Sequence, residues 1–134
     1  MRKICLVCVL LLQACASGQV RPLRPNELAT APYHESGTQT FVGTLMYEGN
    51  CLLFEDEDKT VRVLPVWPHG STFEESLVTF HQPGRLEQRV MVGQEIQLKG
   101  EKSDWTALAD THLAPFEHQC GSQPFFVSGM TPAN

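Results

Sequence analysis

Cysteines are the side chains in this sequence with the widest range of chemistry, because a thiol can form a disulfide, accept a lipid or bind a metal. Five occur, at Cys5, Cys8, Cys15, Cys51 and Cys120. The first three lie near the start of the chain, and the other two lie far apart in the remainder. No C-x-x-C spacing links Cys51 or Cys120 to another cysteine, so a redox-active pair is not indicated there. The two groups therefore need separate explanations.

The first seventeen residues have the pattern of an export signal. Arg2 and Lys3 form a positive start, and an unbroken apolar run follows from Ile4 to Leu12. This run is too short to span a bilayer as a helix, which needs about 20 residues. It has the length of the apolar core of a secretory signal, and small residues follow it.

The segment Leu12-Gln13-Ala14-Cys15 resembles the lipobox of bacterial prolipoproteins. The resemblance implies a signal peptide over residues 1–14, cleavage before Cys15, and acyl chains of the palmitate type on Cys15. It implies membrane attachment without a spanning helix. Ala16 rather than Asp follows the cysteine, which resembles an outer-membrane address. We therefore expect a cell-envelope protein on the outer membrane, facing the periplasm. An ordinary secretory signal and a short membrane anchor are the alternatives.

The remaining chain divides by composition at about residue 39. Residues 16–39 are rich in proline, glycine and small polar residues, with no sustained apolar period, which predicts a lipidated N-terminus and flexible linker over 15–39. Apolar residues alternate from Thr40 onward, which predicts a single β-rich globular domain over 40–134.

The alternation predicts strands at 40–47, 51–54, 60–66, 89–99 and 125–127, with a tail over 130–134. Gly93 interrupts the fourth strand as a bulge or tight bend. Ser71, followed by Glu74, has the spacing of a capping box for a short helix, and residues 77–80 fit either a helix or a strand.

This order of elements resembles an OB-like barrel. We therefore predict an all-β fold, a small OB-like barrel of five to six strands with a short helical insert; a small β-sandwich is the alternative. The stretch 92–100 looks like a strand that such barrels use. The segments Gly49-Asn50-Cys51-Leu52 and Trp67-Pro68-His69-Gly70 also resemble those of small uncharacterised bacterial lipoproteins. That likeness covers residues 41–127 and implies no activity.

Export would place Cys51 and Cys120 in an oxidising compartment, which predicts a disulfide between them. The alternative is a zinc or copper site formed by Cys51, His118 and Cys120, with His112 or His69 as a further ligand. It requires His118 and Cys120 to share one face of a strand.

Motifs for catalysis are weak. The sequence has no Gly-x-Ser-x-Gly elbow, Walker loop or dinucleotide fingerprint. Asp110 and His112 would orient a general base if they shared a strand face, although a solvated loop is the simpler interpretation. The acidic run 55–58 resembles a calcium loop only loosely, and we interpret it as a hairpin tip. We expect no enzyme and no cofactor.

The candidate contact residues are Trp67, Pro68, His69 and Trp105, because binding in OB-like barrels uses strand faces and loops. Packing of Trp67 in the core is the alternative. The net charge of -5 disfavours a nucleic-acid partner. We expect a non-enzymatic binding or scaffolding module for an envelope protein or a small ligand; a metal-binding lipoprotein is the alternative.

Overall fold

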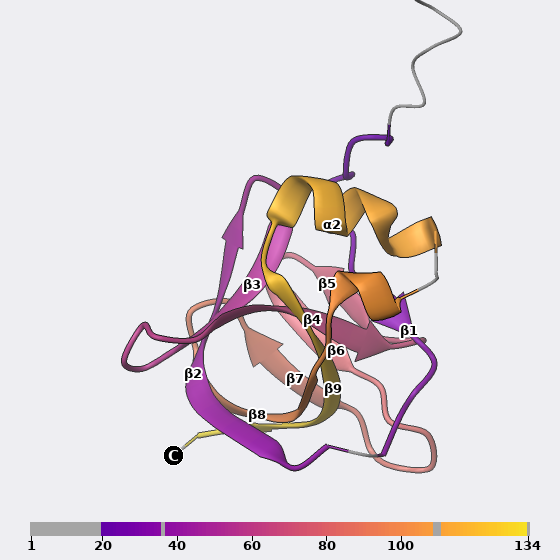
Figure 1. Ribbon diagram of the computed structural model, residues 1–134. Helices are drawn as coiled ribbons and strands as arrows, with labels where there is room; N and C mark the ends of the chain where they lie inside the picture. Colours follow the sequence, from indigo (N-terminus) through magenta and orange to yellow (C-terminus); the bar gives the residue numbers. More distant parts are fainter. Residues whose placement is uncertain (1–19, 36, 109–110, 134) are drawn as a thin grey trace, which may run out of the picture.

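The computed structural model describes residues 20–35, 37–108 and 111–133 (Figure 1). Strands account for about half of these residues and α-helix for only one short segment among them, so the all-β prediction is confirmed. The strands are β1 (Thr30–Ala31), β2 (Gln39–Glu48), β3 (Cys51–Asp56), β4 (Arg62–Pro68), β5 (Thr72–Glu74), β6 (Leu77–Phe80), β7 (Gln88–Met91), β8 (Glu95–Lys102) and β9 (Gln123–Pro132). Two 3-10 turns, Trp105–Ala107 and Thr111–Leu113, precede the short helix α2 (Ala114–Cys120).

Five of these strands close into a barrel. β2, β3 and β4 form an antiparallel meander, β8 pairs with β2, and β9 pairs with β8. The parallel pairing of β9 with β4, from Val63–Val66 to Gln123–Phe126, completes the ring. Closure removes most of the sheet edges, and the order β2-β3-β4-β9-β8 is that of an OB-like Greek-key barrel. The predicted OB-like fold is therefore confirmed.

The predicted helix after the third barrel strand is wrong. This part of the chain forms β5 and β6, which join β7 in a three-stranded sheet. Phe73 is buried between exposed neighbours, which is the period of a strand, and Glu75 and Ser76 turn the chain with positive φ angles. The hydroxyl of Ser71 does not cap a helix, because it accepts the N–H of His81 at 3.0 Å. The short helix lies instead between β8 and β9.

Two further boundaries differ from the predictions. Residues 89–99 do not form one bent strand, because β7 belongs to the small sheet and β8 to the barrel. Gly93 makes the turn between them with a φ of 89°, and its N–H donates to the carbonyl of Leu45 at 2.9 Å. The predicted tail is also wrong, because β9 continues to Pro132 and buries Met130.

β3 and β4 are buried on both faces. Their inward side chains, such as Phe54 and Val63, fill the barrel together with residues of the small sheet. Their outward side chains belong to a second apolar cluster, which also contains residues from the N-terminal segment and α2. These outer-cluster residues include Leu23, Ala29, Ala31, Cys51, Leu53, Leu64, Val66, Leu113 and Phe116. A sheet covered on both faces explains the nearly continuous apolar sequences of β3 and β4.

The linker prediction is wrong for residues 20–35. This segment, which we call the N-terminal strap, runs along the barrel and pairs in parallel with β4 through β1. The N–H of Trp67 donates to the carbonyl of Ala29 at 2.8 Å, and the N–H of His69 donates to that of Ala31 at 2.9 Å. The strap is ordered because the outer face of β4 is apolar and needs a cover, although its own sequence is proline-rich. Residues 15–19 lie outside the described residues.

We predict that Gly100→Ala destabilises the barrel and that Gly129→Ala does not. A Cβ at Gly100 would overlap the carbonyl oxygen of Phe126 on the paired strand β9, next to the register irregularity between Lys99 and Gly100. A Cβ at Gly129 would meet nothing nearer than the Lys99 Cβ at 3.5 Å, which is ordinary contact. In urea unfolding, we expect Gly100→Ala to lower the free energy of unfolding by about 2 kcal/mol and Gly129→Ala to change it by less than about 0.5 kcal/mol. Equal effects of the two variants would contradict the close approach.

Candidate functional site

The predicted disulfide between Cys51 and Cys120 is confirmed. Cys51 opens β3 and Cys120 ends α2, and their Cα atoms lie 5.7 Å apart. The bond ties the helix to the outer face of the barrel, where the Cys51 side chain is buried. The strap is fixed to the same helix, because Gln119 accepts the N–H of Leu23 and donates to the carbonyl of Arg21, both at 2.8 Å.

The zinc or copper site is wrong for the predicted residues. Both sulfurs are engaged in the disulfide, so the two thiolates that the site requires do not exist. His118 and Cys120 also lie in a helix rather than a strand, where residues two apart point in different directions. No group of three or more His, Cys, Asp or Glu side chains in the described part of the chain is placed to hold a metal ion.

The histidine of the predicted acid–base pair has a different environment from the one expected. His112 lies in a 3-10 turn, and Asp110 lies outside the described residues. The Nε2 atom of His112 lies 2.9 Å from the carbonyl oxygen of Thr30, so this nitrogen is the donor. His69 lies beside it, with ring centroids 6.5 Å apart, and its Nδ1 is 3.1 Å from the Thr30 hydroxyl. Both histidines therefore hold β1 in place.

The four predicted contact residues do not form one surface. Trp67 is 1% exposed and packs edge-on against Phe80, so it is a core residue and the prediction that it forms a rim is wrong. Pro68 is also buried, whereas His69 is exposed. Trp105 is half-buried in the outer cluster, and its Nε1 donates to the carbonyl of Ser122 at 2.9 Å.

The acidic tip of the β3–β4 hairpin is closed by its own hydrogen bonds. The carboxylate of Asp56 accepts the N–H groups of Val61 and Thr60 at 2.9 Å and the Thr60 hydroxyl at 3.0 Å. These bonds, led by that from Val61, lower the pKa of Asp56 from its ordinary value. The carboxylate therefore has a structural role, which agrees with the hairpin interpretation.

The usual ligand face of an OB-like barrel is covered in this protein. Such barrels bind ligands on the face of their second and third strands, which here are β3 and β4. The strap and α2 occupy that face and bury its apolar side chains. The open surface of the barrel lies elsewhere.

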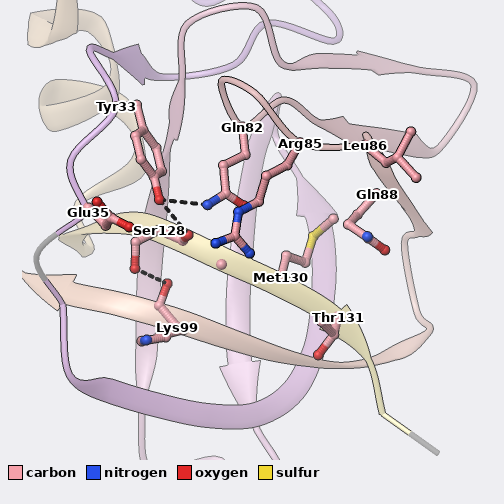
Figure 2. Close-up of a pocket in the computed structure, with 11 residues that line it drawn as sticks. Tyr33, Glu35, Gln82, Arg85, Leu86, Gln88, Lys99, Ser128, Met130 and Thr131 are labelled. Atoms are coloured by element: carbon pink, nitrogen blue, oxygen red, sulfur yellow. Dashed lines mark hydrogen bonds between the residues drawn. The ribbon is translucent and has the colours of Figure 1, made fainter.

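An open groove with a volume of about 600 Å³ lies between β9 and the loop that joins β6 to β7 (Figure 2). Four separate segments of the chain form its walls. The residues that line it are Tyr33, Glu35, Gln82, Arg85, Leu86, Gln88, Lys99, Ser128, Gly129, Met130 and Thr131.

Hydrogen bonds fix one end of this groove. The Tyr33 hydroxyl accepts from the Gln82 amide at 2.8 Å and donates to the carbonyl of Ser128 at 3.4 Å (Figure 2). The Ser128 hydroxyl lies 3.4 Å from the carbonyl of Lys99 and donates to it. The strap, the β6–β7 loop and β9 are thus joined before any ligand binds, which reduces the entropic cost of binding.

The charge of the groove is opposite to that of the protein. Arg85 and Lys99 are both exposed, and neither forms an ion pair within the described part of the chain. Glu35 is the only carboxylate among the described lining residues. Leu86 lies at the other end of the groove and is 88% exposed. The groove therefore combines two available cations with an apolar contact.

Comparison with known proteins found no match to this chain among models of protein families, curated proteins or solved structures. Among the described residues, no helix is long and apolar enough to cross a membrane.

We predict that the disulfide contributes strongly to stability. It joins residues 69 positions apart, and closing a loop of that length lowers the entropy of the unfolded chain by an amount worth about 4 kcal/mol. Urea unfolding of the Cys51→Ala/Cys120→Ala variant should give a free energy lower by roughly that amount. Dithiothreitol should destabilise the original chain and leave this variant unchanged. Rapid thiol labelling of Cys51 in unreduced, folded protein would contradict the bond.

Proposed function

We propose that this protein is an exported, lipid-anchored binding module of the bacterial cell envelope, attached to the membrane through Cys15. The lipobox-like segment before Cys15 is the observation that carries the proposal. The disulfide supports it, because such bonds persist in oxidising compartments outside the cytosol.

The cysteines are consistent with this role. Cleavage before Cys15 would remove Cys5 and Cys8 with the leader. Cys51 and Cys120 are bonded to each other, so Cys15 would be the single thiol of the mature chain available for a lipid. Two or more acyl chains would then hold the protein stably on the membrane.

The position of the strap predicts a short tether. Leu23 is buried against the domain, and the eight residue steps from Cys15 to Leu23 span at most about 28 Å. The domain would therefore lie close to the lipid surface with its α2 end nearest to it. β8 and the end of β9 lie at the opposite end of the barrel (Figure 1). The groove would then face away from the membrane, toward a periplasmic partner if the anchor is in the outer membrane.

The groove supports binding rather than catalysis as the role of the domain. Its walls are fixed by hydrogen bonds, and its two cations have no intramolecular ion-pair partner within the described residues. We propose an envelope protein as the partner and no nucleic acid, because the acidic surface of the chain would repel a phosphate backbone.

We predict that Cys15→Ser releases the protein from the membrane, because the acyl chains would have no attachment point. The measurement is fractionation of cells that express the full chain, with mass spectrometry of the N-terminal peptide. Cys5→Ser is the matched control, since it replaces a cysteine of the leader and should leave both the lipid mass and the membrane fraction unchanged. An unmodified Cys15 still joined to its leader would overturn the proposal.

A further inference from the structure

We propose that the groove binds an extended, carboxylate-bearing segment of a partner protein, with an apolar side chain against Leu86 and carboxylates over Arg85 and Lys99. This inference deepens the proposed binding role and names the chemistry of the ligand.

The charges of the residues that line the groove indicate that its ligand is negatively charged. The chain carries fifteen acidic and ten basic side chains, yet the groove presents Arg85 and Lys99 against the single carboxylate of Glu35. The guanidinium of Arg85 points toward β9 near the middle of the groove, whereas Glu35 lies at the Tyr33 end (Figure 2). A ligand carboxylate would therefore bind over Arg85, away from Glu35, where the guanidinium can donate two hydrogen bonds.

The backbone of β9 favours an extended peptide. β9 pairs with β4 only as far as Phe126, whereas it pairs with β8 as far as Pro132. The other edge of its second half therefore has no strand partner among the described residues. A strand edge of this kind presents backbone groups that an extended peptide can pair with. Gly129 leaves this part of the wall without a side chain.

The apolar contact distinguishes a peptide from other anions. Leu86 is 88% exposed at one end of the groove, and a phosphate ion would leave it unused. An acidic sugar is favoured by an open aromatic face, but Tyr33 is half-buried and its hydroxyl is already bonded to Gln82 and Ser128. A peptide with an apolar residue beside its carboxylates would contact both the exposed Leu86 and the two cations of the groove.

The test is fluorescence anisotropy with the full chain purified in mild detergent. The probe is a fluorescein-labelled hexapeptide of alternating leucine and glutamate. We expect saturable binding that weakens with salt, because the contacts with Arg85 and Lys99 are charged. The same peptide with lysine in place of glutamate should bind at least roughly tenfold more weakly, because its charges are repelled.

Single substitutions locate the binding site. Arg85→Ala and Lys99→Ala should each raise the Kd of the glutamate peptide by roughly tenfold, the loss expected for one charge-assisted hydrogen bond. Gly129→Val should also weaken binding, because its side chain would project into the groove without changing the charge there. Arg24→Ala is the matched control, since it removes an exposed arginine of the strap that does not line the groove, and it should change the Kd less than about twofold.

Three outcomes would overturn the inference. An Arg24→Ala effect equal to that of Arg85→Ala would mean that only overall charge matters. Displacement of the peptide by inorganic phosphate at equal concentration would identify a simple anion site. Tighter binding of a galacturonate hexamer than of the peptide would identify a sugar site. The measurement is repeated with Cys15→Ser, so failure of the groove and failure of the anchor are separate results.

Discussion

Burial of both faces of β3 and β4 is the constraint on which the rest of this structure depends. A barrel needs one apolar face per strand to fill its interior, but these two strands carry apolar side chains on the outside as well. Exposure of that outer face would cost about 1.5–3 kcal/mol for each large side chain. The N-terminal strap and α2 provide the cover, and the disulfide joins the cover to the first residue of β3.

This cover determines which surface of the barrel is open to a ligand. The strand face that OB-like barrels commonly use for ligands is inside the molecule here. The small β5-β6-β7 sheet contributes Phe73, Val78 and Phe80 to the barrel core, and its β6–β7 loop reaches over β9. The open groove thus arises from the element inserted between the third and fourth barrel strands, while the usual face has become part of the core.

The same cover links the fold to the proposed anchor. Because the strap is packed from Leu23 onward, a lipid on Cys15 would leave the domain little freedom to move away from the membrane. Acidic side chains elsewhere on the surface would oppose flat contact with anionic lipid. Arg85 and Lys99, which have no ion-pair partner among the described residues, would then lie at the end of the barrel that faces away from the membrane.

Patterns that depend on near neighbours were readable from the residues alone. Alternation along 40–47 predicted β2. Cys51 and Cys120 are the two cysteines outside the first seventeen residues, which predicted the disulfide because no other partner was available. The capping-box spacing at Ser71 was misleading because contacts with the barrel core favour a strand there, and tertiary packing overrides local propensity. The packing of the proline-rich strap could not be predicted for a related reason. The strap is held in place by its pairing with β4, and its own sequence carries no strand pattern. The groove could be found only from the tertiary structure, because barrel closure brings together residues that are distant in the chain. These are Tyr33, Arg85, Lys99 and Ser128. Arg85 and Leu86 beside the Pro83-Gly84 turn were its one local signal, because such a turn places its neighbours on the surface.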